Sequence, residues 1–199
     1  MFATLDWQGA GDADGAATWD CHRPDFARRM ARQLAEAKGR GAVGLKIFKQ
    51  FGLGYKNTDG SLISIDDPRW DPIWAACGEL ALPVIIHTAD PVAFFEPIDE
   101  TNERWEELSR HPEWSFHGDQ FPPRDALLAA RNRVIDRHRG TMFIGAHVAN
   151  YPENLAEVAR WLDTYPNLVI EVSSRIAELG RQPYTARKFI LKYADRIMF

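Results

Sequence analysis

Two histidines, His87 and His147, each close a short run of hydrophobic residues. The runs are PVIIHT at residues 83–88 and MFIGAH at residues 142–147. Imidazole nitrogens bind divalent metals and exchange protons near neutral pH, so two such rings together can hold an ion and activate a water molecule. A single histidine of this kind more often serves as a hydrogen-bonded core residue. Two that end successive strands favour a shared divalent metal site.

The alternation of side chains along a strand predicts which residues share a face with these histidines. In the run VGLKIF, the aliphatic side chains suit a face covered by helices, which leaves Lys46 and Phe48 on the inner face. The same alternation turns His87 inward in the second run, and it turns Phe143 and His147 inward in the third. We therefore expect Lys46 and Phe48 to contribute to a substrate site beside the two imidazoles.

Charged residues add to this inner face, and their roles stay open. Lys46 can bridge metal ions as a carbamate, anchor a substrate anion, or act as a structural ammonium that pairs with Glu171. Glu171, in the run LVIEVS, is more typical of a structural partner than of a catalyst. Arg175 follows the same run, where its guanidinium can clamp a substrate carboxylate or form a surface ion pair. Lys46 and Arg175 are both candidate substrate-binding residues.

Residues 90–138 form a segment much longer than one crossover helix requires. It contains two helical patterns, at residues 99–110 and 123–137, and the irregular stretch between them carries His117. Long insertions at the carboxyl end of a strand commonly hold the substrate loops of α/β enzymes, although a plain surface elaboration has the same sequence signature. We expect a substrate loop here, with His117 as a substrate contact.

The elements that must position these residues alternate between short β-rich runs and longer amphipathic stretches. Six runs are predicted to be strands: residues 2–7, 43–48, 83–88, 142–147, 168–173 and 196–199. Outside the long insertion, helical stripes cover residues 24–38, 67–80, 152–162 and 184–193. This alternation of strands and helices predicts an α/β fold in which right-handed crossover connections build a parallel sheet covered by helices.

Composition narrows the class of protein. With 199 residues, 45% of them hydrophobic, the chain can build a core without disulfides, and Cys21 and Cys77 suit free thiols in a reducing compartment. The 24 basic and 28 acidic side chains give a net charge of −4, which lacks the basic excess of nucleic-acid-binding proteins. No apolar run is long enough to span a membrane, and the acidic start does not resemble a secretory leader. We expect a cytoplasmic protein that binds a small-molecule substrate rather than nucleic acid or membrane.

The strings VGLKIF, LPVIIHTAD, FIGAHVANYPENL and NLVIEVSSR, with the terminal ADRIMF, resemble the amidohydrolase-related TIM-barrel metal-dependent hydrolases. That group includes decarboxylases of the aminocarboxymuconate-semialdehyde and resorcylate kinds. The resemblance covers nearly the whole chain and implies that the six runs are strands 3 to 8 of a (β/α)8 barrel. It also implies a divalent metal, zinc in the first place or manganese, held by His87. His147 is then a second ligand or the catalytic base beside the metal.

The chain departs from that family pattern at both ends. Members of the family begin with a His-x-His metal pair on strand 1 and carry an aspartate after strand 8, and neither is present here. A complete barrel also takes about 250 residues. We therefore expect residues 1–199 to form a single, incomplete metal-dependent hydrolase barrel domain with its substrate-loop insertion at about 90–138. Its open edge strands favour self-association as a homo-oligomer, and the fragment alone is expected to be inactive.

Three functions are compatible with these residues. The first is hydrolysis, by a metal-activated water, of a small substrate that bears a carboxylate. The second is metal-dependent, non-oxidative decarboxylation of an unsaturated or aromatic acid. The third is a catalytically inactive barrel fragment that serves as a binding module. Released carbon dioxide distinguishes the second from the first, and poor metal affinity is the mark of the third.

Overall fold

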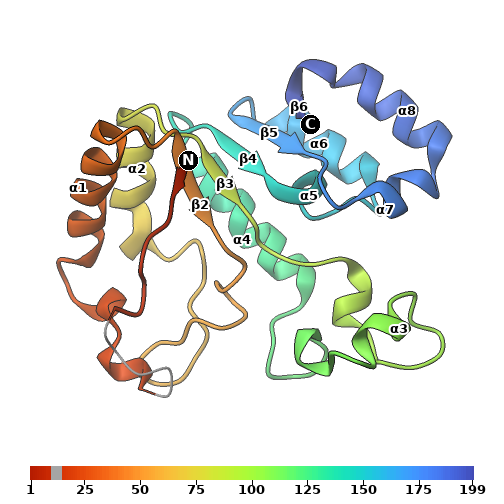
Figure 1. The fold of residues 1–199 in the computed structure, drawn as a ribbon, viewed down its shortest axis with the longest axis horizontal. Coiled ribbons are helices and arrows are strands. Elements are labelled where there is room, and N and C mark those ends of the chain that lie inside the picture. The colour runs from red at the N-terminus through yellow and green to blue at the C-terminus, as the bar shows by residue number, and fades with distance from the viewer. Residues whose placement is uncertain (10–14) are drawn as a thin grey trace.

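The fold is built on one six-stranded sheet whose strands are all parallel and follow the chain order from β1 to β6 (Figure 1). The computed structural model describes residues 1–9 and 15–199. The strands are β1 (Phe2–Ala3), β2 (Gly44–Ile47), β3 (Val84–Ile86), β4 (Phe143–Gly145), β5 (Leu168–Glu171) and β6 (Ile197–Met198). The prediction of six parallel strands in an α/β fold is confirmed, although every strand is shorter than predicted.

Helices connect successive strands. They are α1 (Phe26–Gly39), α2 (Asp71–Glu79), α3 (Trp105–Leu108), α4 (Arg124–Arg137), α5 (Ala146–Ala149), α6 (Leu155–Thr164), α7 (Ile176–Gly180) and α8 (Pro183–Lys192). Short 3₁₀ helices lie at Ala16–Thr18, Asp20–His22, Pro68–Trp70, Val92–Phe95, Pro112–Trp114 and Ala194–Arg196. The predicted helices appear as α1, α2, α4, α6 and α8, close to their expected bounds, whereas α5 and α7 were not predicted.

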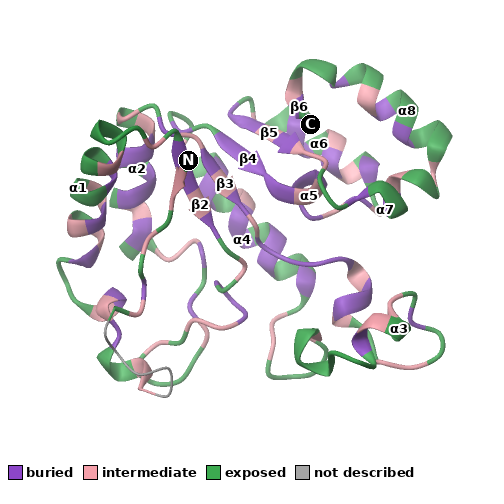
Figure 2. Cartoon of the chain, in the orientation of Figure 1, coloured by how far each residue is buried: buried purple, intermediate pink, exposed green. Residues whose placement is uncertain are grey.

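The apolar stripes read from the sequence are the faces that the helices bury. On α1, Phe26, Met30 and Leu34 recur every fourth residue, and each is at most 4% exposed. The helical segment before β3 begins where the side chain of Asp67 accepts a hydrogen bond from the backbone N–H of Arg69. The outer surfaces of α1 and α8 stay exposed while the strands between the helices are largely buried (Figure 2). Full burial of one large apolar side chain contributes about 1.5–3 kcal/mol, so these stripes hold the helices to the sheet.

The register of the sheet corrects one prediction about which residues face inward. Lys46 pairs with Ile85 and Ile85 pairs with Ile144, and residues paired in parallel strands project to the same side. Ile144 therefore shares the face of Lys46, whereas Phe143 projects to the other face and is fully buried. The expectation that Phe143 and His147 share the inner face of this strand is wrong. The strand ends at Gly145, so strand alternation does not govern the direction of His147.

The segment between β3 and α4 lies beyond the carboxyl end of β3 (Figure 1). The helix predicted at residues 99–110 is reduced to α3, a single turn. Before that turn, the buried side chain of Asn102 donates to the carbonyls of Ala93 and Pro97, both at 2.8 Å, and Asp99 accepts from Thr101. These local hydrogen bonds compete with helix formation and explain why the helical pattern is cut short.

Two further sequence predictions concern thiols and membranes. Cys21 and Cys77 are free and buried, and burial raises the pKa of Cys21 to about 11 and that of Cys77 to about 12. Both groups therefore remain protonated thiols near neutral pH. Among the residues that the structure describes, no helix combines the length and the apolar character that a membrane span requires.

Candidate functional site

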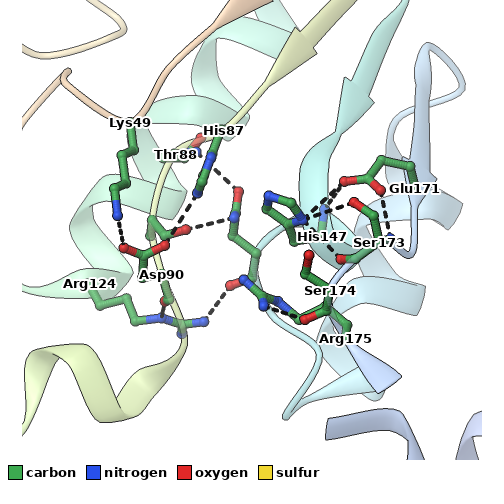
Figure 3. Close-up of polar contacts among 12 residues, drawn as sticks. Lys49, His87, Thr88, Asp90, Arg124, His147, Glu171, Ser173, Ser174 and Arg175 are labelled. Atoms are coloured by element: carbon green, nitrogen blue, oxygen red, sulfur yellow. Dashed lines mark hydrogen bonds and ion pairs between the residues drawn. The ribbon is translucent and has the colours of Figure 1, made fainter. Parts of the chain in front are cut away.

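The two histidines singled out by the sequence lie against each other at the carboxyl ends of β3 and β4 (Figure 3). Their ring centroids are 4.7 Å apart, and the ring planes meet edge to face at 79°. His87 directly follows β3, and His147 follows β4 after one intervening residue. Because β3 and β4 are neighbours and parallel, both rings reach the same rim of the sheet.

A buried aspartate, Asp90, fixes the ring of His87. Nε2 of His87 lies 3.3 Å from one oxygen of Asp90, and Lys49 forms an ion pair with the other oxygen. Burial favours a raised pKa for Asp90, but the hydrogen bond from His87 and the charge of Lys49 outweigh burial and lower the pKa below its usual value. The ionised carboxylate can only accept, so neutral His87 carries its proton on Nε2 and keeps a lone pair on Nδ1.

The ring of His147 is fixed in the opposite tautomer. Its Nδ1 lies 3.0 Å from the backbone carbonyl of Ser173, and 3.3 Å from both the Ser173 hydroxyl and a carboxylate oxygen of Glu171. The nearest of these groups, the carbonyl, can only accept. Burial lowers the pKa of His147; the Ser173 carbonyl opposes this shift and the nearby His87 reinforces it. Neutral His147 therefore carries its proton on Nδ1 and presents a basic Nε2.

Glu171 ties the end of β5 to the turn that carries His147. Its carboxylate accepts hydrogen bonds from the backbone N–H of His147 and, at 2.7 Å, from that of Ser173. Burial favours a raised pKa for Glu171, but these hydrogen bonds and the nearby His147 outweigh it and lower the pKa. Glu171 thus has a structural role through direct contacts with His147 and Ser173, and among the described residues it does not form the suggested ion pair with Lys46 within 4.0 Å.

The backbone reaches His147 through a left-handed turn. Residues 147–150 all have positive φ angles, between 51° and 59°, within and just after α5. For residues other than glycine this conformation costs roughly 1–2 kcal/mol each, so surrounding contacts must hold it. Gly145 allows the turn to fold close to the strand, because a Cβ there would lie 2.8 Å from the Cβ of Ala149.

Three buried polar side chains hold this turn, and sequence reasoning missed all of them. Asn150 accepts from the backbone N–H of Thr88 at 3.1 Å and donates to the carbonyl of Ala89 at 2.6 Å. Arg124 and Arg131, on α4, donate to backbone carbonyls of the turn. Asn150 thereby connects the residues after His87 to the residues after His147. The one available signal was its residue type, because asparagine tolerates the left-handed region better than most residues.

Three other residues were predicted to bind substrate: Lys46, Phe48 and His117. Lys46 is half-buried on the inner face, where burial lowers its pKa, and among the described residues it forms no ion pair within 4.0 Å. Phe48 lies past the end of β2 and is exposed, with the Lys46 ammonium 5.3 Å from its ring centroid. His117 is exposed, and its Nδ1 lies 3.2 Å from the carbonyl of Phe95. The register places Phe48 level with His87, whose backbone N–H donates to the carbonyl of Ile47 at 3.1 Å. Among the described residues, neither Phe48 nor His117 has a hydrogen bond or ring contact with His87 or His147.

Arg175 has the position that the sequence suggested, beside the histidine pair. It follows β5, lies close to Ser174 and His147, and is 7% exposed (Figure 3). A cavity of about 510 Å³ opens next to it. The walls of this cavity include the following side chains from three separate segments: Lys49, Asp90, Phe94, Arg104, Trp114 and Arg175.

The donor atoms at the rim match one part of a metal site. Ligating histidines usually donate one ring N–H to a carboxylate or carbonyl and bind the metal through the other nitrogen, and both His87 and His147 have this arrangement. A zinc site takes three protein ligands or more. In the described part of the chain, no three His, Cys, Asp or Glu side chains are placed to hold one ion. These residues therefore provide an incomplete ligand set.

Comparisons with known proteins agree with the geometry. A sequence profile of the amidohydrolase family matches residues 5–199. No curated protein matches the chain. Among solved structures, 2,6-dihydroxybenzoate decarboxylase from Rhizobium is similar over 100% of this chain and 58% of its own, with a TM-score of 0.54 and 19% identity.

Two more solved structures share the fold. An uncharacterised TIM-barrel protein from Bordetella bronchiseptica matches 94% of this chain and 57% of its own, with a TM-score of 0.53 and 18% identity. The third is a dihydroxybenzoic acid decarboxylase from Polaromonas with bound manganese and the inhibitor 2-nitroresorcinol. It matches 88% of this chain and 54% of its own, with a TM-score of 0.50 and 19% identity. This chain therefore spans a little over half the length of these proteins. The likeness establishes the fold: part of a TIM barrel, as the sequence predicted.

Proposed function

Because the chain belongs to the amidohydrolase family, we propose that it forms part of the active site of a metal-dependent enzyme that decarboxylates a small aromatic or unsaturated acid. The observation that carries the proposal is the contact between His87 and His147, in which each ring keeps one nitrogen free for chemistry. Decarboxylases among the solved structures of the same fold favour this reaction over hydrolysis.

Decarboxylation replaces a C–C bond by a C–H bond. The carbon that bears the carboxylate takes up one proton, the C–C bond breaks, and its electron pair stays with that carbon as carbon dioxide leaves. A group that handles this proton must have a lone pair and a pKa near neutrality. Nε2 of His147 offers the lone pair, since burial lowers the pKa of the ring and so favours its neutral form, and the Ser173 carbonyl holds its other nitrogen. We assign to it the transfer of a proton between a substrate hydroxyl or water and the substrate carbon.

His87 and Asp90 have a different role in this proposal. Asp90, held ionised by Lys49, orients His87 so that its Nδ1 lone pair is available as a ligand. A bound divalent ion would withdraw electron density from substrate oxygens. His87 is the residue of this chain that would hold it, together with ligands that the described residues do not provide, because the Nε2 lone pair of His147 is assigned to proton transfer. Manganese and zinc both accept imidazole nitrogen, and the decarboxylase from Polaromonas holds manganese.

Hydrolysis is the second candidate, and a specific observation supports it. A neutral His147 with a free Nε2 can equally deprotonate a water molecule, which would then attack a carbonyl. In hydrolysis, a carboxylate on the substrate would be bound by the enzyme but would not be released as carbon dioxide. The two reactions use the same residues and differ in their product.

The test is to load the full-length enzyme to which this chain contributes with manganese or zinc, incubate it with a panel of hydroxybenzoates and unsaturated acids, and measure released carbon dioxide, because this chain alone holds an incomplete ligand set. We expect carbon dioxide from at least one acid, with loss of the signal in His87→Ala. Ester or lactone cleavage without carbon dioxide would reject decarboxylation in favour of hydrolysis. A metal analysis of both variants gives a readout independent of turnover, because His87→Ala should retain less metal.

A further inference from the structure

The cavity beside Arg175 has the properties of a binding site for an acid. It lies between the long insertion, which contributes Phe94, Arg104 and Trp114, and the loops after β2 and β5, which contribute Lys49 and Arg175. Its volume of about 510 Å³ is within the usual range for small-molecule pockets. The cavity reaches the rim of the sheet at Asp90, the partner of His87.

Arg175 is a buried cation that lacks a countercharge. Its side chain donates one hydrogen bond, to the neighbouring carbonyl of Ser174 at 2.6 Å. Its Nε finds no hydrogen-bond partner within the described residues, and no carboxylate there lies within 4.0 Å. A buried charge without a partner is costly, and native proteins rarely keep one unless something completes it.

The other cations of the cavity are already neutralised. Lys49 pairs with Asp90, and Arg104 pairs with Glu107 and with the fully buried Glu178. Glu178 is the acidic residue closest after Arg175 in the chain. One of its oxygens contacts Arg104, and its buried other oxygen has no hydrogen-bond partner among the described residues, Arg175 included. Among the described residues, Arg175 is therefore the cation lining this cavity that has no carboxylate within 4.0 Å.

The aromatic walls indicate the shape of the ligand. Phe94 is buried at 8% exposure, and Trp114 is partly exposed and stacks on His111 with ring centroids 4.1 Å apart. Flat apolar surfaces of this kind suit a planar ring, while a guanidinium matches the two oxygens of a carboxylate.

We propose that Arg175 and the cavity between Phe94 and Trp114 form a specificity subsite that binds the carboxylate of a planar, aromatic acid. This inference deepens the proposed function, because it names the substrate class that would reach the histidine pair. The carboxylate bound at Arg175 serves for recognition and does not react. For a substrate with two acidic groups, the group at Arg175 would be retained while the other reacts at the histidines.

The test uses benzoate as a probe, with binding to the whole protein measured by calorimetry or ligand-observed NMR. We expect Arg175→Gln to weaken benzoate binding by about 10- to 100-fold, because a charge-assisted hydrogen bond to a buried guanidinium is lost. Arg160→Gln serves as the matched control, since Arg160 is an exposed arginine paired with Glu157 on α6. Acetate, which lacks the ring, should bind more weakly than benzoate.

Thermal stability gives the second readout. If Arg175 is an uncompensated buried cation, Arg175→Gln should keep or raise the melting temperature of the ligand-free protein while benzoate binding falls. A lower melting temperature with unchanged benzoate affinity would overturn the proposal and make Arg175 a structural residue. Failure of wild-type protein to bind benzoate would also overturn it. Neither outcome depends on carbon dioxide release, so this inference and the proposed reaction can fail separately.

Discussion

At the scale of single residues, the account depends on which nitrogen of each histidine bears the proton. A carboxylate and a backbone carbonyl, two groups that only accept, decide the tautomers of His87 and His147. The sequence singled out both histidines, and it named Arg175, after β5, as a residue that could clamp a substrate carboxylate. It could not identify Asp90, Lys49 or Asn150, because their role comes from contacts between separate segments rather than from a local pattern.

Substitution of His147 tests its assigned role in proton transfer. We expect His147→Gln to lower turnover by about 100-fold or more, since glutamine cannot exchange protons near neutral pH. Its melting temperature should change little, because the ring is near the rim and only partly buried. His22→Gln, at a half-buried histidine in the 3₁₀ helix Asp20–His22, is the control and should leave turnover unchanged. Comparable activity in His147→Gln and wild type would remove His147 from the catalytic group.

Asn150 gives a prediction about the left-handed turn. Asn150→Ala loses the hydrogen bonds to Thr88 and Ala89 and leaves a buried backbone group unpaired, which costs about 1–3 kcal/mol of unfolding free energy. Asn150→Gly loses the same bonds but adopts positive φ without strain, so it should be less destabilised than the alanine variant. Chemical denaturation of both variants measures the difference. An alanine variant as stable as the glycine variant would show that the turn carries no conformational strain.

At the scale of elements, periodicity predicted the helices that bury an apolar stripe and failed where local hydrogen bonds or strand ends intervene. α1 and α4 follow their stripes closely. The side-chain contacts of Asn102 and Asp99 shorten the helix predicted at residues 99–110 to α3. The inward-facing side chains of β4 were assigned wrongly because His147 was assumed to belong to the strand. The two histidines still meet, since the left-handed turn after β4 directs His147 to the rim.

Ala81, just after α2, gives a prediction about stability, and its control substitution should change the unfolding free energy in the opposite direction. Ala81 follows this helix with a φ of +49° and is exposed, so Ala81→Gly relieves an unfavourable conformation. We expect a gain of about 0.5–1 kcal/mol in unfolding free energy. Ala35→Gly, at an exposed position inside α1, should instead lose about 0.5–1 kcal/mol. If a urea titration gave the same change in unfolding free energy for both substitutions, the positive φ of Ala81 would not be a source of strain.

At the scale of the whole molecule, the sheet is open. Within residues 1–9 and 15–199, β1 and β6 each have one neighbouring strand, so each leaves backbone groups on its outer edge without a strand partner. The relatives of known structure are longer, and this chain corresponds to 58% of the decarboxylase from Rhizobium. The sequence predicted an incomplete barrel from the number of strands, and the sheet agrees with that prediction.

The open edges predict how the 199-residue chain behaves alone. Unpaired edge strands pair readily with other chains, so we expect self-association that increases with protein concentration. Sedimentation velocity over a wide concentration range measures it. A single monomeric species at every concentration would mean that the edges are protected and that the prediction is wrong.

NMR of protein labelled with ¹⁵N in its histidines measures whether His87 and His147 meet at one rim with opposite tautomers. We predict a nuclear Overhauser contact between the two rings, whose centroids lie 4.7 Å apart. The same sample should show a proton on Nε2 of His87 and on Nδ1 of His147. The absence of the contact between the rings, or a proton on Nε2 of neutral His147, would contradict the account.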